Sequence, residues 1–389
     1  MEAADHAVLS LLLIVAAAFL LPIASHWVAV PAVVLEIAFG VLIGPVLGVV
    51  EQAEFIDRLA DLGFLLLMFL AGFEIDVRTF GRRGMGQMAV GLTTFALTMG
   101  CAYLAARVLG YGLFMTFVLA TTSVGLVVPT LRSTRRMATR LGQSILVSAI
   151  LADFLTLVGV TIYALVEERG TGLNLLVVPG YFVVVASTLL ALRRLVWWRP
   201  EWFDRLFQLD DPEEIGTRAS LTVMLVFVGL SILFGIEGIL GAFLAGAGFA
   251  MVFRNRGTLG VQLSGFSYGF LIPVFFIDVG IRFDVDALSE EGAITGMLAL
   301  IGIAVLVKSL PSLVLLVRRH SLRETLAAGA LLSARLSLII AVAELGVRLG
   351  AIDRTTEASI IVLAAVTATI APVAFRILAP PLAPGGSRD

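Results

Sequence analysis

A few ionisable side chains stand inside long apolar runs of this sequence, where charged groups are rare. Asp153 lies in SAILADFLTLVGV, Lys308 in LVKSLPSL, Arg335 in LLSARLSLII and Glu36 in PAVVLEIAFGVLIGP. A carboxyl group that is shielded from water releases its proton less readily than an exposed one. It can then hold either a proton or a cation, and competition between the two couples their movements. We therefore expect Asp153 to bind a cation and a proton in turn, with a permanent structural ion pair to Lys308 as the alternative.

Lys308 is the only lysine in a chain that otherwise uses arginine for its cationic residues. A buried lysine can lose its proton, whereas an arginine in practice cannot. We expect Lys308 to take part in the mechanism, either as a second titrating site or as a charge that tunes Asp153. The alternative is that its long stem snorkels to the interface. Arg335 is expected to be structural, pairing with Glu36 or Asp153 or binding the carbonyls of an unwound helix. Glu36 either pairs with Arg335 or has a dynamic role.

Apolar runs long enough to cross a bilayer recur along the whole chain. Of its 389 residues, 59% are hydrophobic and 14% are charged, against roughly 25% charged residues in a soluble domain. A crossing helix needs about 20 apolar residues, and the pattern predicts an all-α membrane protein of about thirteen spans. Asp278 and Glu344 lie near the ends of their spans, where we expect them to reach water. The predicted spans are roughly 5–25, 28–50, 59–73, 85–109, 112–131, 141–166, 172–195, 217–234, 237–253, 260–281, 293–317, 322–349 and 357–378.

Arginine residues are concentrated in alternate connections between these spans. Cytoplasmic loops of membrane proteins carry the excess of Lys and Arg, which predicts an external N-terminus, a cytoplasmic C-terminus and an odd number of spans in the inner (plasma) membrane. The first run lacks the basic start and the cleavage site of a signal peptide, so we expect it to remain as a span. The long polar connection at 196–216 is expected to lie at the cytoplasmic interface, and the tail 380–389 to be disordered.

The composition argues against several classes of function. Cys101 is the only cysteine, and the histidines His6, His26 and His320 are far apart in the sequence. We therefore expect no disulfide framework and no zinc or iron site. An intramembrane hydrolase would need a Ser/His or metal set, which the sequence lacks, so we do not expect an enzyme. No cofactor and no nucleic-acid partner are expected.

Two spans contain residues that favour an interrupted helix. Many transporters place their ion sites where half-helices meet near the middle of the membrane. The fifth span, FVLATTSVGLVVPTL, is expected to unwind and to offer hydroxyl ligands, and the twelfth, AAGALLSARLSLII, is expected to break in the matching place. The alternative is ordinary packing through small residues. The residues concerned are Thr121, Thr122, Ser123, Gly125 and Pro129 in the fifth span, and Gly329, Ser333, Arg335 and Ser337 in the twelfth.

Several segments, in order along the chain, resemble the monovalent cation:proton antiporters. PAVVLEIAFGVLIGPVLG is similar to a second-span motif of that family, and LGFLLLMFLAGFEID to its third-span signature. GILGAFLAGAGFA and YGFLIPVFFIDVGI resemble its ninth and tenth spans, and TTSVGLVVPTLR followed by ILADF resembles its ion-site helices. The resemblance covers nearly the whole chain and points to the branch that contains Kef-type proteins and related sodium/proton exchangers.

The resemblance implies a fold of thirteen helices with two inverted repeats and crossed broken helices. It also implies a homodimer in which one domain makes the dimer contact and a core domain moves as an elevator. Carried over to this chain, the dimer domain takes residues 1–84 and 217–292. The core domain takes 85–171 and 293–379, and residues 172–216 form a linker helix and the interfacial segment.

The same resemblance implies that Thr122 and Ser123 lie on the unwound crossover, Asp153 at the ion-binding aspartate and Lys308 at the basic residue of the eleventh span. The chain departs from the family pattern at Ala152. Electrogenic members have Asp at that position, electroneutral members Asn, and Kef-type proteins tend to have Gln. A single acidic carrier implies one proton per cation and electroneutral exchange, although a titrating Lys308 would change the count. Further departures are Leu35 in place of a usual Gly, and Arg335-Leu336-Ser337 where the family often has Arg-Gly-Glu.

The expected function is secondary antiport of a monovalent cation, Na⁺ or K⁺, against protons, with a role in pH homeostasis. Hydroxyls and one carboxylate suit Na⁺, K⁺ and Li⁺, so the residues leave the ion open. One alternative is a gated potassium efflux protein of Kef type, with regulation expected to come from a separate subunit because no nucleotide-binding domain follows. The other is a membrane sensor or scaffold that has lost transport, which Ala152 and Ser337 would fit.

Overall fold

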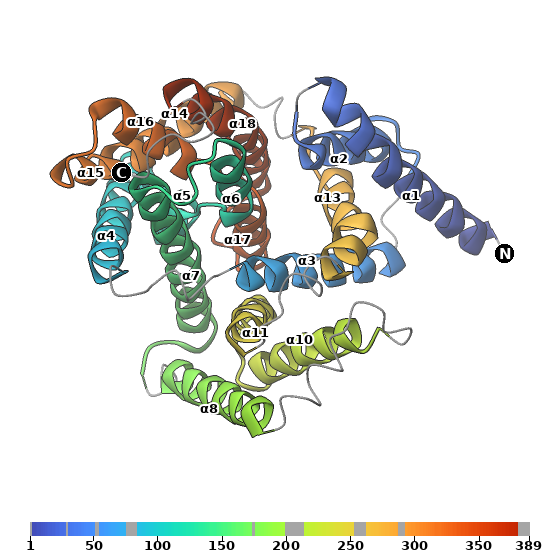
Figure 1. Ribbon diagram of the computed structural model, residues 1–389. Helices are drawn as coiled ribbons and strands as arrows, with labels where there is room; N and C mark the ends of the chain where they lie inside the picture. Colours follow the sequence, from blue (N-terminus) through green and yellow to red (C-terminus); the bar gives the residue numbers. More distant parts are fainter. Residues whose placement is uncertain are drawn as a thin grey trace. The chain divides into compact units, whose positions relative to one another are not determined.

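Helices make up the fold throughout the described part of the chain. In the computed structural model, shown in Figure 1, the described residues are 2–28, 30–50, 54–74, 84–172, 176–198, 214–252, 262–286 and 292–379, and no strand occurs among them. The expected all-α membrane architecture is confirmed. Within these residues, nine helices are long and apolar enough to cross a membrane, or ten if one bent pair counts as a single span.

The lengths and apolar composition of the described helices do not confirm the expected count of about thirteen spans. Two of the expected spans hold shorter apolar helices, Ala32–Val46 and Gly238–Val252. A third expected span corresponds to Glu54–Phe73, whose first turns carry Glu54, Asp57, Arg58 and Asp61. Most of the interfacial segment expected at 196–216, and the tail expected at 380–389, lie outside the described residues.

The chain divides into two compact units, each built from two stretches of sequence. Unit 1 comprises residues 1–77 and 164–283, and unit 2 comprises residues 78–163 and 284–389. Helix α7 (Arg140–Arg169) runs from unit 2 into unit 1. The other helices of unit 1 are α1 (Glu2–Val28), α2 (Ala32–Val41) with the π-helical turn η1 (Leu42–Val46), α3 (Glu54–Phe73), α8 (Val177–Trp198), α10 (Ile215–Leu233), α11 (Gly238–Val252), and α13 (Ile272–Ile281) preceded by the π-helical turn η4 (Ser267–Leu271).

Glycines let the helices of unit 1 approach each other closely. A methyl group on Gly40 of α2 would collide with the backbone oxygen of Ile277 in α13, and one on Gly280 with the backbone oxygen of Ile37. Such close approach through small residues is how helices associate in lipid, where the hydrophobic effect does not drive them together. In Figure 1, α2 and α13 lie side by side, as this packing requires. Helices α3 and α11 pack in the same way through Gly72 and Gly246.

Unit 2 contains two interrupted helices. Helix α5 (Leu113–Ala120) ends and α6 (Val124–Ser133) begins with three residues between them, and α16 (Leu322–Leu332) is followed by α17 (Ser337–Arg348) at a bend of 47°. Helix α14 packs against α4, α5 and α16, while α18 packs against α6, α16 and α17. The remaining helices are α4 (Gly84–Val108), α14 (Ala293–Ser312), the single turn α15 (Val314–Val317) and α18 (Arg354–Leu378).

The first interruption lies where the hydroxyl-rich sequence predicts it. Thr121 and Ser123 have extended backbone dihedrals, so neither residue continues the helix. Consecutive β-branched or hydroxyl side chains favour such a break, because they lose rotamer freedom in a helix or compete for its backbone hydrogen bonds. Gly125 and Pro129 lie inside α6 and not in the break. In the second interruption, Ser333 to Leu336 separate the helices and Ser337 opens α17.

Candidate functional site

Asp153 lies on α7, and its side chain contacts the first residue of α6. Its side chain is buried, with the residue 6% exposed, and Oδ2 accepts a hydrogen bond of 3.3 Å from the backbone N–H of Val124, the first residue of α6. The N-terminus of a helix leaves N–H groups without helical partners and carries a partial positive charge, so it favours an anion. This arrangement stabilises a charged carboxylate at a depth where an isolated charge is costly.

The break between α5 and α6 supplies buried oxygen atoms beside this carboxylate. Thr121, Thr122 and Ser123 are between 0% and 2% exposed. The hydroxyl of Thr121 is used locally, because Oγ1 donates a 2.7 Å hydrogen bond to the carbonyl of Val118. Thr122 and Ser123 supply the other two hydroxyl groups of the break.

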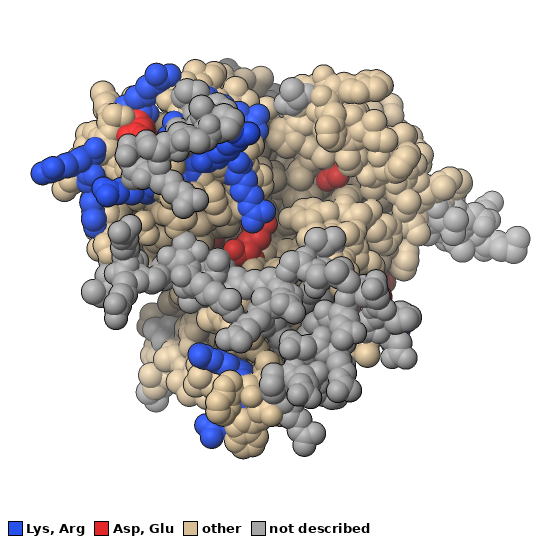
Figure 2. All heavy atoms as spheres, viewed as in Figure 1, with Lys and Arg blue, Asp and Glu red and all other residues tan. Residues whose placement is uncertain are grey.

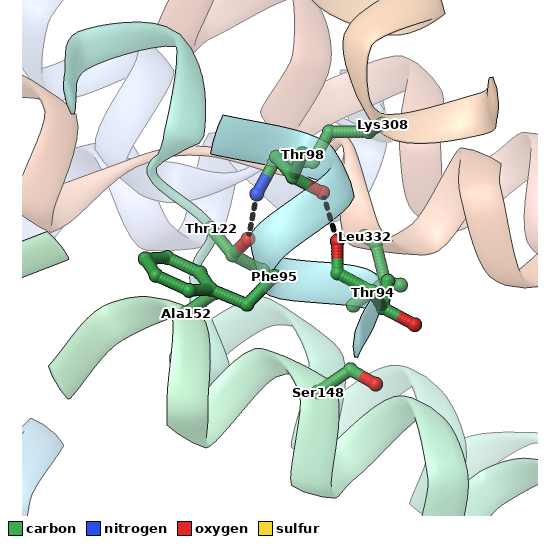
Figure 3. Close-up of a pocket in the computed structure, with 8 residues that line it drawn as sticks. All are labelled: Thr94, Phe95, Thr98, Thr122, Ser148, Ala152, Lys308 and Leu332. Carbon is green, nitrogen blue, oxygen red and sulfur yellow. Dashed lines mark hydrogen bonds between the residues drawn. The ribbon is translucent and has the colours of Figure 1, made fainter. Parts of the chain in front are cut away.

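Lys308 of α14 reaches into the same break. It is 3% exposed, and its Nζ donates hydrogen bonds of 2.6 Å to the carbonyl oxygen of Ala120 and 2.7 Å to Oγ1 of Thr122, the second of which is drawn in Figure 3. Ala120 is the last residue of α5, whose final carbonyls have no helical partner and carry partial negative charge. The ammonium group thus caps α5 and occupies two oxygen atoms of the break.

Arg335 lies in the second break and joins three segments of unit 2. It is fully buried, and its guanidinium donates to the carbonyls of Leu119 at 2.8 Å, Ala304 at 2.9 Å and Ser333 at 3.2 Å. The planar guanidinium presents several donors in a fixed geometry, so one side chain can satisfy carbonyls from different helices. Arg335 was expected to bind Glu36, Asp153 or backbone carbonyls, and these three hydrogen bonds are all to backbone carbonyls.

The remaining acidic candidates belong to other helices. Glu36 is on α2 in unit 1, where it is 3% exposed. Glu344 is partly exposed and pairs with Arg348 one turn later, which agrees with its expected access to water. Asp278 was expected to reach water too, but that expectation is wrong: it is buried, with 4% exposed, and accepts from Nε of Arg282 at 2.8 Å. The bonded arginine shields Asp278 from water near the end of α13.

A small cavity beside the cluster reveals hydroxyl groups that sequence reasoning missed. It has a volume of about 10 Å³ and is lined by Thr94, Phe95 and Thr98 of α4, Thr122 of the break, Ser148 and Ala152 of α7, Lys308 of α14 and Leu332 of α16 (Figure 3). Thr94 and Thr98 stand one helical turn apart, which places two hydroxyls on the buried face of α4. That spacing is the signal in the sequence that could have identified them.

The donor set suits a monovalent cation better than a transition metal. No group of three or more His, Cys, Asp or Glu side chains gathers anywhere in the described ranges. Hydroxyl, carbonyl and carboxylate oxygens are hard ligands, which suit alkali and alkaline-earth ions.

Comparison with known proteins places the chain in a family. Residues 14–379 match the family model for the transmembrane sodium/hydrogen exchangers. The chain is 32% identical to YjbQ of Bacillus subtilis over 96% of its own length, but it spans only 64% of YjbQ. It is 30% identical to the Na⁺/H⁺-K⁺ antiporter GerN of Bacillus cereus, over 72% of this chain and 71% of GerN.

The fold has a solved counterpart as well. The structure of the sodium proton antiporter MjNhaP1 from Methanocaldococcus jannaschii matches with a TM-score of 0.67 at 14% identity, over 97% of this chain and 99% of that one. At this identity the match concerns the fold alone. The family model, which covers nearly the whole chain, shows that this protein belongs to the transmembrane sodium/hydrogen exchanger family.

Proposed function

We propose that this protein is a secondary antiporter that exchanges a monovalent cation, Na⁺ or K⁺, for protons, with Asp153 as the shared carrier. The observation that carries the proposal is the shared use of oxygens in the α5–α6 break. The Lys308 ammonium holds Thr122 and Ala120, and the Asp153 carboxylate accepts from the first N–H of α6. A cation that binds these oxygens and the Asp153 carboxylate must displace the Lys308 ammonium group from Thr122 and Ala120 and the proton from Asp153, so binding of the cation and binding of the proton oppose each other.

Electroneutral exchange is supported by the inventory of buried acids. Asp153 is the only buried carboxylate in the described part of unit 2, and its neighbour Ala152 carries no proton. One cation binding against one proton moves no net charge across the membrane. A second proton released by Lys308 in each cycle would make the exchange electrogenic instead, so the stoichiometry is open to direct measurement.

An elevator-type cycle is the proposed route for alternating access. Asp153, Thr122, Ser123, Lys308 and Arg335 all fall in unit 2. Under this proposal unit 2 moves as the core, while unit 1 provides the contact of a homodimer. Cross-links between introduced cysteines in unit 1 of two protomers should leave exchange intact, whereas cross-links that tie unit 2 to unit 1 should stop it. Exchange that survives the second kind of cross-link would overturn the elevator.

The proposed orientation has an external N-terminus and a cytoplasmic C-terminus in the plasma membrane. Figure 2 shows Lys and Arg side chains gathered at the end of unit 2 where α15 and α16 lie. Arg376 donates to Ser133 and Arg323 to the carbonyl of Ile377, so the end of α18 meets the end of α6 and the start of α16 there. In a Cys101→Ser background, Ala138→Cys should be protected from an impermeant thiol reagent in intact cells and Thr171→Cys should be labelled. The opposite pattern would invert the topology.

The deciding experiment uses purified protein in liposomes that contain a trapped pH dye. Na⁺, K⁺ or Li⁺ is added outside an acid-loaded lumen, with and without a clamp on the membrane potential. Antiport predicts a cation-dependent rise in lumenal pH that is lost in Asp153→Asn and retained in Glu344→Gln, the control at a partly exposed, paired carboxylate. Insensitivity to the clamp establishes electroneutral exchange. Normal exchange in Asp153→Asn would overturn the assignment of Asp153 as the carrier. No change in lumenal pH with any of the cations would favour the gated or transport-inactive alternatives.

A further inference from the structure

Two helix ends in unit 2 have arginine at a residue where the backbone favours glycine. Helices α6 and α15 end in the same kind of turn, in which a backbone N–H donates to the carbonyl five residues earlier, from Arg136 at 2.9 Å and from His320 at 3.4 Å. The residue before each of these N–H groups has the left-handed conformation, Arg135 with a φ of 57° and Arg319 with a φ of 64°. A side chain is strained in that conformation, so glycine is the usual residue there.

Glycine closes the same turn elsewhere in unit 2. Gly110 follows α4 with a φ of 78° and Gly350 follows α17 with a φ of 67°, and in both turns the next N–H again donates to the carbonyl five residues earlier. In the proposed orientation the turns with glycine are external and those with arginine are cytoplasmic. An excess of arginine in cytoplasmic loops does not require it at the one strained residue of the turn. An interaction made by the two arginine side chains would account for this placement.

The two turns with arginine meet at one carboxylate. Glu324, in the first turn of α16, interacts electrostatically with Arg136, the residue that follows Arg135. Its Oε2 lies 3.7 Å from Nδ1 of His320, the residue that follows Arg319. Both turns therefore lie at the end of unit 2 where Figure 2 shows the cationic side chains gathered.

The arginines at this end of unit 2 keep their positive charge available to a ligand. The side chains of Arg135 and Arg319 are exposed, and neither makes a hydrogen bond or an ion pair with a residue that the structure describes. Residues 124–140 and 314–332 contain several arginines but a single acidic residue, Glu324. Guanidinium groups bind phosphate oxygens through paired hydrogen bonds, so the charge and its chemistry fit a phosphate group.

Exposed apolar side chains beside these arginines indicate that the phosphate belongs to a lipid. Val317 is 84% exposed and Leu322 58%, two residues before and three residues after Arg319. Ile377, whose carbonyl accepts from Arg323, is 67% exposed. At the end of a membrane-spanning helix, such side chains contact acyl chains while arginine reaches the headgroups. A soluble anion would leave these apolar groups in water.

We propose that this end of unit 2 binds the headgroup phosphates of anionic phospholipids, with Arg135 and Arg319 as the residues that hold a headgroup. Each arginine near an anionic lipid surface is expected to strengthen binding about fivefold. The binding then offsets the strain of the two left-handed residues. It does not depend on transport, so its test is separate from that of the proposed antiport.

Lipid binding is measured on purified protein in an uncharged detergent. Phosphatidylglycerol or phosphatidylcholine with the same acyl chains is added, and the thermal unfolding midpoint and the lipids retained in native mass spectrometry are recorded. Phosphatidylglycerol should raise the midpoint and be retained, whereas phosphatidylcholine should do neither. The double variant Arg135→Gln/Arg319→Gln should need about thirtyfold more phosphatidylglycerol for the same shift. Equal effects of the two lipids, or an unchanged response in the double variant, would overturn the proposal.

Arg348→Gln is the matched control for loss of an arginine. Arg348 lies in the last turn of α17, which ends in the turn closed by Gly350, and its side chain is 55% exposed. The variant should respond to phosphatidylglycerol as the wild type does. A response weakened as much as in the double variant would mean that net charge, and not the two turns, determines the binding, and would overturn the assignment of Arg135 and Arg319.

Replacement by glycine separates the strain from the charge. Arg135→Gly and Arg319→Gly remove the side chain from a left-handed residue, so each should raise the unfolding midpoint without lipid by about 1–2 °C. Each should nevertheless bind phosphatidylglycerol about fivefold more weakly than the wild type. Side chains that only support local packing would give the opposite result, a lower midpoint without lipid and an unchanged response to phosphatidylglycerol, and that result would overturn the proposal.

Two soluble anions distinguish the lipid from other sources of negative charge. Glycerol phosphate has the phosphate but no acyl chains, and poly-glutamate represents an acidic protein segment. Neither should reproduce the midpoint shift at concentrations at which phosphatidylglycerol saturates, because neither covers the apolar side chains. A full shift with glycerol phosphate would assign the surface to free phosphate compounds, and a full shift with poly-glutamate would assign it to a protein partner. Either result would overturn the lipid assignment.

Discussion

The ammonium nitrogen of Lys308 lies 2.7 Å from Oγ1 of Thr122, a residue 186 positions earlier in the chain. This bond ties α14 to the unwound segment between α5 and α6. It also occupies one of the few buried hydroxyls beside Asp153. The same oxygen therefore serves the resting structure and, under the proposed function, the transported ion.

The first prediction concerns the hydroxyl of Thr122. Thr122→Val should weaken cation exchange at least about tenfold, because a buried ammonium and the cation both lose an oxygen partner. Thr122→Ser keeps the hydroxyl and should retain most of the activity. Cation-dependent pH changes in liposomes, measured over a range of cation concentrations, provide the readout.

Thr121 gives the matched control for this change. Its hydroxyl already donates to the carbonyl of Val118 in the preceding helix α5, although Thr121 is as buried as Thr122. Thr121→Val should therefore reduce exchange far less than Thr122→Val. Equal losses in the two variants would indicate that the break tolerates no valine, and the ligand role of Thr122 would be rejected.

The second prediction concerns Arg335 and stability. Arg335→Met should lower the free energy of unfolding by about 3 kcal/mol or more, because three buried carbonyls from α5, α14 and the second break lose a charged partner. Arg335→Lys should restore only part of this loss, since a point charge cannot reproduce the geometry of a planar fork. Unfolding in detergent, followed by tryptophan fluorescence against denaturant or temperature, measures the effect.

Arg323 offers the comparison for Arg335. It also donates to one helix-terminal carbonyl, that of Ile377, but it is exposed to solvent. Arg323→Met is expected to cost about 1 kcal/mol or less, because water can replace the bond. Comparable losses for the two arginines would mean that the bonds of Arg335 across the breaks do not stabilise unit 2.

The class of the fold could be predicted from the sequence, whereas the packing that builds the site could not. Repeated apolar runs suffice for an all-α membrane protein, and Thr121 to Ser123 mark the first break. The periodicity of apolar residues does not indicate which segments far apart in the sequence contact each other. The hydrogen bonds from Lys308 to Ala120 and from Arg335 to Ala304 could therefore not be predicted. Thr94 was missed because a hydroxyl in an apolar helix looks the same whether it packs against a neighbour or faces a cavity. The burial of Asp278 could not be predicted, because its partner Arg282 follows the end of the apolar run.

The third prediction concerns the contact between α2 and α13 in unit 1. Gly40→Ala would push a methyl group into the backbone oxygen of Ile277, with the Cα of Gly280 2.9 Å away. A backbone atom cannot rotate aside as a side chain can, so the helices must separate, at a cost of about 1–3 kcal/mol. The midpoint of thermal unfolding should fall accordingly.

Gly229 on α10 is the control for Gly40 in the same unit. No described atom lies within 4 Å of a methyl group placed there. Gly229→Ala should leave the stability unchanged or raise it by up to about 1 kcal/mol, because alanine favours the helix. A Gly40→Ala protein as stable as Gly229→Ala would show that the two helices do not need their close approach.

The fourth prediction concerns the start of α18 and its dependence on pH. Asp353 is the N-cap residue, and its Oδ1 accepts from the backbone N–H of Thr356 at 2.8 Å. Hydrogen bonds from the side chain and the backbone of Thr356 lower the pKa of Asp353 below its ordinary value of 3.8. Because the pKa is lower in the folded state, the carboxylate contributes its full stabilisation above pH 3.8 and loses it as the pH falls further.

Replacement of Asp353 separates the cap from its charge. Asp353→Ala should lower the free energy of unfolding by about 1 kcal/mol at neutral pH, and Asp353→Asn by less, because asparagine also caps helices well. The difference between wild type and Asp353→Ala should shrink in acid below pH 3.8, whereas that between Asp353→Asn and Asp353→Ala should not change with pH. Unfolding midpoints of the three proteins, measured at pH 7 and at the lowest pH that each tolerates in detergent, give the test. A wild-type advantage that persists unchanged in acid would mean that the carboxylate charge does not contribute to the cap.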